Sequence, residues 1–195
     1  VPLLPTQVIS GTRRKVWWRC PKGHSWRAAV YSRTTLGTGC PVCTGRQVLA
    51  GENDLATVFP QLAAQWDAEK NGSLTPEAVS PNSNRRVWWK CEKGHSYCAV
   101  IAHRAQSGSD CPYCTNRKVL AGFNDLAALE PAVAKEWHPT LNGALTPEMV
   151  TAGSHRKVWW QCALGHVWKA AIYPRTGKQQ CGCPVCAGRT KRKTK

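Results

Sequence analysis

Cysteine and histidine recur along this 195-residue chain at a spacing suited to metal binding. Three segments read Cys-x3-His, and a Cys-x2-Cys pair follows after 15 residues, or after 16 in the third segment. Tetrahedral Zn²⁺ takes four sulfur or nitrogen ligands, usually supplied as two close pairs. The pattern therefore predicts three structural Cys3His zinc sites, one per segment. The predicted ligands are Cys20, His24, Cys40 and Cys43; Cys91, His95, Cys111 and Cys114; and Cys162, His166, Cys183 and Cys186.

Two of the 11 cysteines, Cys98 and Cys181, fall outside this pattern. A disulfide framework is the alternative use of so many cysteines, but the odd count and the regular alternation with histidine argue against it. We interpret Cys98 and Cys181 as free thiols, with Cys181 as an alternative ligand of the third site. Thiolate–zinc chemistry indicates a reducing compartment. We expect the cytoplasm, in association with the nucleoid, for a bacterial protein, and the nucleus or an organelle for a eukaryotic one.

The ligands belong to repeats with a period of 71 residues, which indicates tandem modules. The connecting segments repeat as well, since AGENDLA at 50–56 matches AGFNDLA at 121–127. The chain starts inside a repeat and lacks an initial Met, so we expect a fragment or a processed protein. The predicted organisation is zinc finger 1 at 1–47, a helical connector plus finger 2 at 48–118, a connector plus finger 3 at 119–190, and a basic tail at 191–195.

Alternating residues around the first ligand pair predict a β-hairpin. Strands are expected at 16–20 and 26–30, with the Cys-x3-His pair in the turn between them. The second pair suits the first turn of a short helix, where free amides favour thiolate. A knuckle, a hairpin and a helix start around one zinc form a treble clef. The predicted fold class is thus a small zinc-stabilised α+β fold, with three tandem treble-clef fingers joined by ordered helical connectors.

The connectors carry helix signals. Asn53 or Asp54 can cap a helix, and Pro60 suits the first position of the next one. Trp66 and Trp137 are expected to pack the connector helices against a finger. The connectors are therefore predicted to be ordered spacers.

With these motifs, (R/K)-V-W-W-x-C-x3-H, then CPxC, then N-D-L-A…P…W…N-G-x-L-T-P, the chain resembles the probable zinc-ribbon, treble-clef repeat family. This family occurs in bacteria, phages and plants, often in tandem copies. The resemblance covers nearly the whole chain. It implies a nucleic-acid-binding role, sometimes beside nuclease-like domains, and it implies neither a reaction nor a target sequence.

Charge is distributed by segment. The net charge is +16, and the finger segments 10–47, 81–118 and 152–189 hold 8, 7 and 6 basic residues against 0, 2 and 0 acidic ones. The connectors at 48–80 and 119–151 each hold one basic residue, against 5 and 4 acidic ones. Positive charge gathered on the metal modules favours a polyanionic partner. No run of 18 apolar residues is present, so we expect no membrane association.

Basic residues at equivalent positions of the three fingers are the candidate nucleic-acid contacts, because Arg offers a fork of donors suited to phosphates and base edges. They are Arg13, Arg14, Lys15, Arg33, Arg46, Arg85, Arg86, Arg104, Arg117, Arg156, Lys157, Arg175 and Arg189.

The Trp pairs divide between two faces of the first strand. Trp18, Trp89 and Trp160 share a face with a zinc ligand and are predicted to lie in the core. Trp17, Trp88 and Trp159 either pack under a connector or stack on nucleic acid, and we favour packing.

The sequence favours a non-enzymatic, monomeric protein that binds double-stranded DNA as a regulator or targeting module, with a few Arg side chains reading groove edges. RNA binding is one alternative, and the DNA-targeting part of a larger nuclease or defence protein is another. Catalysis within the chain is disfavoured, because its three non-ligand histidines occupy different repeat positions. A protein-interaction adaptor would leave the basic fingers unexplained.

Overall fold

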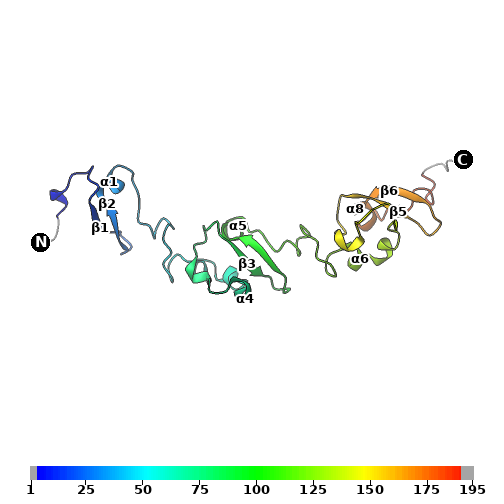
Figure 1. Cartoon of the computed structure of the whole chain (residues 1–195), viewed down its shortest axis with the longest axis horizontal. Coiled ribbons are helices and arrows are strands. Elements are labelled where there is room, and N and C mark those ends of the chain that lie inside the picture. Colours follow the sequence, from blue (N-terminus) through cyan, green and yellow to red (C-terminus); the bar gives the residue numbers. More distant parts are fainter. Residues whose placement is uncertain (1–3, 190–195) are drawn as a thin grey trace. The chain divides into compact units, whose positions relative to one another are not determined.

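A computed structural model describes residues 4–189 of the chain, so the predicted basic tail at 191–195 lies outside the described residues. The chain divides into two compact units, 1–109 and 110–195, and each is described by itself. The described part contains three two-stranded antiparallel hairpins (Figure 1). They pair β1 (Lys15–Arg19) with β2 (Ser25–Ala29), β3 (Arg86–Lys90) with β4 (Ser96–Val100), and β5 (Lys157–Gln161) with β6 (Val167–Ala171).

The second and third hairpins bury one face of their first strand, and in β1 the same face is half-buried. In β3, Val87 and Trp89 are 2% and 0% exposed, while Arg86, Trp88 and Lys90 point outward. Successive side chains of a strand face opposite sides, so the alternation of apolar and basic residues fixes which face is buried. The strands begin one residue earlier than the sequence suggested, and the predicted hairpins are otherwise present.

A short helix that was not predicted follows each hairpin. These helices are α1 (Val30–Thr34), α5 (Ile101–Ser107) and α8 (Tyr173–Thr176). The first begins where Val30 N donates to Arg14 O and Tyr31 N donates to Thr12 O, so the chain leaves the hairpin while still bonded to the segment before β1.

The second ligand pair lies in a single hydrogen-bonded turn instead of the expected helix. Thr44 N donates to Cys40 O at 3.0 Å and Gln47 N to Pro41 O at 2.9 Å, after which the chain turns away. Gly45 ends this turn with φ at 70°, and Asn116 and Gly188 hold the same place at 57° and 68°. The left-handed region admits mainly Gly and Asn, and this backbone reversal stops a helix from continuing.

The connectors contain short helices, as predicted. The first has α2 (Leu55–Val58), α3 (Pro60–Ala63), α4 (Ala68–Asn71) and the 3-10 turn η2 (Pro76–Ala78). The second has α6 (Leu126–Leu129), α7 (Pro131–Ala134) and η3 (Pro147–Met149), and a related turn, η1 (Pro5–Gln7), precedes the first hairpin. Asp54 is the cap of α2, because its carboxylate accepts from Thr57 N at 2.9 Å.

Connector tryptophans pack against the hairpin that follows them, which confirms the prediction for Trp66 and Trp137. The Trp66 ring meets Trp89 edge to face at 5.4 Å, and Trp137 meets Trp160 in the same way at 5.5 Å. Each connector indole also donates from Nε1 to a backbone carbonyl eight residues on, Leu74 and Leu145 respectively. The connectors thereby complete the cores of the second and third hairpins.

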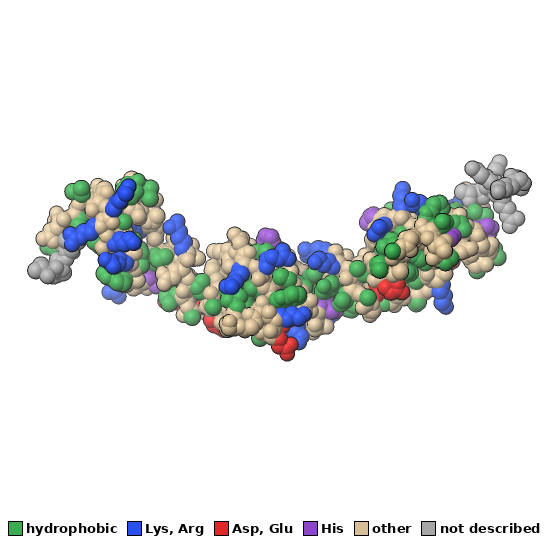
Figure 2. Space-filling model, in the orientation of Figure 1, with side chains coloured by type: hydrophobic (Ala, Val, Ile, Leu, Met, Phe, Trp, Pro, Cys, Tyr) green, Lys and Arg blue, Asp and Glu red, His purple; other side chains and the backbone are tan. Residues whose placement is uncertain are grey.

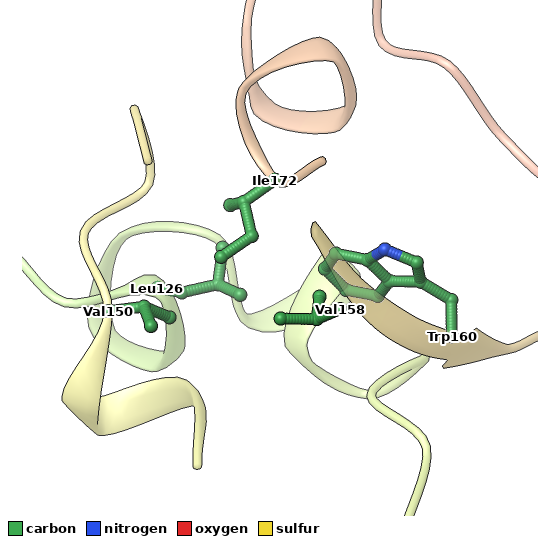
Figure 3. Packing of buried hydrophobic residues seen from close by; sticks show 5 residues of the cluster. All are labelled: Leu126, Val150, Val158, Trp160 and Ile172. Carbon is green, nitrogen blue, oxygen red and sulfur yellow. The ribbon is translucent and has the colours of Figure 1, made fainter. Parts of the chain in front are cut away.

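Figure 3 shows the resulting core around the third hairpin, where Leu126, Val150, Val158, Trp160 and Ile172 pack together. Leu126 comes from the connector and Val150 from the end of η3, and Leu126 N donates to Val150 O at 2.8 Å. The core therefore depends on connector and hairpin together. None of the helices between residues 4 and 189 has the length and apolar character needed to cross a membrane.

Candidate metal centres and nucleic-acid interface

The four predicted ligands of the first finger converge on one point. His24 Nδ1 lies 3.3 Å from both Cys20 Sγ and Cys43 Sγ and 3.6 Å from Cys40 Sγ, and the Cys20 and Cys43 sulfurs are 3.8 Å apart. In a tetrahedral zinc site, sulfurs lie about 3.8 Å apart and sulfur and nitrogen about 3.6 Å apart, given the usual bond lengths. The donor atoms thus occupy the corners of a zinc-sized tetrahedron.

The other two fingers repeat this arrangement. In the third, His166 Nδ1 lies 3.4, 3.7 and 3.3 Å from the sulfurs of Cys162, Cys183 and Cys186. In the second, Cys91 Sγ lies 3.5 Å from His95 Nδ1. All 12 predicted ligands fall into three four-residue groups, each with its donor atoms within 4.8 Å of one another: Cys20, His24, Cys40 and Cys43; Cys91, His95, Cys111 and Cys114; and Cys162, His166, Cys183 and Cys186.

Backbone amides favour the thiolate form of Cys20, which is the form that binds a cation. Burial opposes ionisation of Cys20, but backbone hydrogen bonds at His24 and Lys22 lower its pKa to about 7. Burial and the neighbouring thiols Cys20 and Cys40 raise the pKa of Cys43 to about 11, because several thiolates repel one another. A divalent cation removes that repulsion, so this donor set suits Zn²⁺.

An asparagine in each connector holds the Cys-x2-Cys turn through the same set of hydrogen bonds. Asn53 Nδ2 donates to Val42 O at 2.7 Å and to Gln47 O at 2.9 Å, and its Oδ1 accepts from Leu49 N at 2.7 Å. Asn124 does the same for the second finger. Asn53 was one of two predicted helix caps, but Asp54 caps α2 and Asn53 instead fixes the metal-binding turn.

A carboxylate supports the histidine of the first finger. Glu52 pairs with His24 Nε2 and raises the pKa of His24 to about 9. A carboxylate on the far nitrogen orients a ligating imidazole. The equivalent residue of the next connector is Phe123, which has no carboxylate.

The two extra cysteines belong to none of the three donor groups. Cys98 lies opposite Trp88 in the second hairpin, and the Cys181 thiol faces Gln179 at 3.9 Å. None of the cysteines forms a disulfide within the described chain. The third site is therefore completed by Cys183 and Cys186, and Cys181 is not needed as a replacement.

Ten of the 13 candidate nucleic-acid contacts are exposed. Seven of them lie at the start of the hairpins, and three lie just after the Cys-x2-Cys turn. On the face shown in Figure 2, Lys and Arg side chains clearly outnumber Asp and Glu. The exposed set is Arg13, Arg14, Lys15, Arg46, Arg85, Arg86, Arg117, Arg156, Lys157 and Arg189.

The remaining candidates, Arg33, Arg104 and Arg175, occupy a structural position, and we withdraw them as contacts. Arg104 and Arg175 are each 7% exposed, and Arg33 is half-buried. Each guanidinium lies over two aromatic rings of its own hairpin, with Arg175 4.2 Å from the Trp160 ring centre and 5.1 Å from Trp168. Arg104 also bonds Gln65, and Arg175 pairs with Glu136. Arg104 and Arg175 therefore tie connector to finger.

The tryptophans differ between fingers. Trp89 and Trp160 are fully buried, as predicted, but Trp18 is only half-buried. On the opposite face Trp17 is 73% exposed and Trp88 37%, while Trp159 is half-buried. Lys70 of the connector lies 4.5 Å from the Trp88 ring centre and covers part of it.

Three Cys3His centres on β-hairpins, joined by packed connectors, define a tandem zinc-finger protein. The sequence matches the family described as "Probable Treble clef zinc finger domain" over residues 2–46, 62–117 and 133–189, so the chain belongs to that family. A protein of Escherichia phage T5 described as "Putative endonuclease" is 23% identical over 113 residues, which are 57% of this chain and 35% of the phage protein. The chain thus spans about a third of that relative's length.

Proposed function

We propose that the chain is a non-catalytic module that binds double-stranded DNA through the exposed basic residues of its fingers. Support comes from where the charge lies. The ten exposed Arg and Lys flank the metal centres, whereas the acidic residues lie mainly in the connectors. Phosphate contacts supply most of the affinity of such proteins and set their register on the duplex.

A pocket in the first unit gives the most specific support for DNA binding. Arg46, after the first Cys-x2-Cys turn, and Arg85, before the second hairpin, line it together with Ser80, Asn82 and Ser83. Two guanidinium groups beside hydroxyl and amide donors suit a phosphate group, which accepts several charge-assisted hydrogen bonds. Arg46 and Arg85 come from adjacent repeats, so a phosphate bound here would be held by residues of two repeats.

The relative from phage T5 favours a second, compatible function for the chain. Its printed description is an endonuclease, and this chain corresponds to part of its length. The module would then direct a nuclease to DNA. RNA binding needs exposed aromatics for stacking, and Trp17 meets that condition far better than Trp88 or Trp159.

The test is a salt titration of binding to a duplex of random sequence, measured by fluorescence anisotropy. The logarithm of the binding constant should fall with the logarithm of salt concentration, by about 0.9 per phosphate contact. The double variant Arg46→Gln/Arg85→Gln should lower that slope by about 1.8. A charge-matched control, Lys135→Gln/Lys178→Gln, removes two exposed lysines outside the proposed set and should keep the slope.

A binding constant that does not change with salt concentration would refute the proposal. Equal changes of the salt slope in the two double variants would refute it as well. Structured RNA serves as competitor. If it displaces the duplex at equal concentration, the DNA assignment is wrong and the RNA alternative gains support. Incubation of the zinc-loaded chain with supercoiled plasmid and Mg²⁺ tests the non-catalytic assignment, and nicking that follows the purified chain would contradict it.

A further inference from the structure

In the second finger, the connector forms an isolated antiparallel bridge, Trp66 with Trp89, on the outer edge of β3. Lys90 N donates to Gln65 O at 2.6 Å, and Asp67 N donates to Trp88 O at 3.1 Å. The Asn71 side chain accepts from Trp88 N at 2.8 Å and donates to Trp88 O at 2.7 Å. In Figure 1, α4, which ends at Asn71, lies beside β3. Backbone pairing of this kind satisfies part of an otherwise open sheet edge.

The third finger repeats the contact. Gln161 N donates to Glu136 O at 2.7 Å, and His138 N donates to Trp159 O at 3.1 Å. Asn142 bonds the Trp159 N–H and C=O at 2.8 and 2.9 Å. In both connectors the pattern is the same, a Gln or Glu followed by Trp, with Asn five residues after the Trp.

Side chains of this connector segment fill two further positions. The indole of Trp66 or Trp137 lies edge-on against the buried Trp of the hairpin. The residue before it, Gln65 or Glu136, bonds the buried arginine that follows the hairpin. Each docked segment therefore supplies a strand edge, an indole and a side-chain acceptor.

The first finger presents the same receiving surface without such a segment among residues 4–189. Cys20 N bonds His24 O, and Val30 N bonds Arg14 O. Because antiparallel strands alternate bonded and non-bonded pairs, Trp17 and Arg19 direct their amides to the outer edge of β1. No backbone or side-chain acceptor in the described part of the chain reaches them.

The exposure of the two tryptophans of β1 also indicates that this surface is uncovered. Trp18, the counterpart of the fully buried Trp89 and Trp160, is half-buried, and Trp17 is 73% exposed against 37% for Trp88. Arg33 donates to Thr38 O, as its counterparts donate to Ser109 O and Cys181 O, but has no Gln or Glu beside it within residues 4–189. A partly exposed indole, a strand edge and a cation are thus all presented together.

We infer that the first finger carries a docking site for a polypeptide segment of the connector type, with Gln or Glu, then Trp, then Asn five residues later. The occupant is identified by the two internal copies of the contact. Charge is complementary, because segment 10–47 has no acidic residue and both connectors are acidic. A base stacked on Trp17 would leave the outer amide edge unpaired and the Trp18 indole partly exposed.

Amide hydrogen exchange, followed by NMR on the zinc-loaded 195-residue chain, tests this site with internal controls. In the chain alone, Trp17 and Arg19 should exchange freely, while Trp88, Lys90 and Gln161 should be protected. A synthetic peptide of residues 131–146, at millimolar concentration, should raise the protection of Trp17 and Arg19 by at least roughly tenfold. The other amides should not change, because their connectors are tethered at a millimolar effective concentration.

A control peptide with Trp137→Ala and Asn142→Ala keeps the charge and should give no protection. If the wild-type peptide leaves Trp17 and Arg19 unprotected, or if the control peptide protects them equally, the inference is wrong. Protection of both amides by duplex DNA without peptide would assign the surface to nucleic acid and overturn it. Protection that rises with chain concentration alone supports the site and identifies a second copy as the source of the segment.

Discussion

Replacing Arg175 with alanine tests whether the arginine after each hairpin is structural or contacts nucleic acid. Its guanidinium carbon lies over the rings of Trp160 and Trp168, its Nε donates to Cys181 O at 3.1 Å, and its Nη2 pairs with Glu136. The variant removes all of these interactions at once. It also leaves the Glu136 carboxylate without its cation.

The expected destabilisation can be built from these contacts. The cation–π contact at a mostly buried site contributes about 1 kcal/mol. Breaking the ion pair and its hydrogen bonds costs about 2 kcal/mol, near the lower end for such pairs, because the Glu136 side chain is 34% exposed and water can solvate it. The finger should therefore lose about 3 kcal/mol, which raises the population of its opened state by roughly 100-fold.

Amide hydrogen exchange at Val158 and Trp160 measures that opening, since both amides lie in the strand that Arg175 covers. Arg175→Ala should lose roughly 100-fold of protection there and keep the salt slope of DNA binding. The matched control is Arg189→Ala, because Arg189 is exposed in the same finger. It should keep the protection and lower the slope by about 0.9.

The opposite pattern would refute this reasoning. If Arg175→Ala retained full protection at Trp160 while its salt slope fell, the arginine would be a phosphate contact, and its burial between tryptophans would have no stabilising role.

Two further predictions concern the metal centres. Cys43→Ser should reduce the zinc content, measured by native mass spectrometry, from three ions to two, while Cys98→Ser should keep three; three ions in Cys43→Ser would contradict the ligand assignment. Asn124→Ala removes hydrogen bonds to Tyr113 O and Lys118 O at 2.8 Å each and should destabilise the second metal-binding turn by about 2 kcal/mol. One of the three zincs should then transfer faster to a chelating dye, and an unchanged rate, or the same acceleration in exposed Asn84→Ala, would show that Asn124 does not hold the site.

The metal ligands could be predicted from the sequence because spacing alone determines which side chains can share an ion. The residue types two positions after the last ligand, Gly45 and Asn116, also indicated how the metal-binding turn ends. Both types tolerate the left-handed backbone that ends the turn, and they could have warned against a helix there. Asp54 was among the predicted caps because a carboxylate before Leu55 can reach the amide three residues on.

The role of Arg33, Arg104 and Arg175 could not be obtained from recurrence. A residue that repeats at one position in three modules can contact a shared ligand or support a shared core, and the sequence pattern is the same in both cases. The difference arises from the short helix after each hairpin, which turns the arginine back over the tryptophan face. Four-to-seven-residue helices of this kind have too few residues for a periodic signal.

The same packing explains why the basic surface is available at all. In β3 and β5 the Val and the second Trp are buried, so the alternate positions and the segment before the strand face solvent. Zinc and the connector segment supply the stability that a core this small lacks. Because stability comes from those two sources, Arg and Lys can occupy the remaining surface without weakening the core. The first finger has its zinc site but no docked connector segment among residues 4–189, so its hairpin should open more readily than the second, and the inferred docking site is where a bound segment would restore that stability.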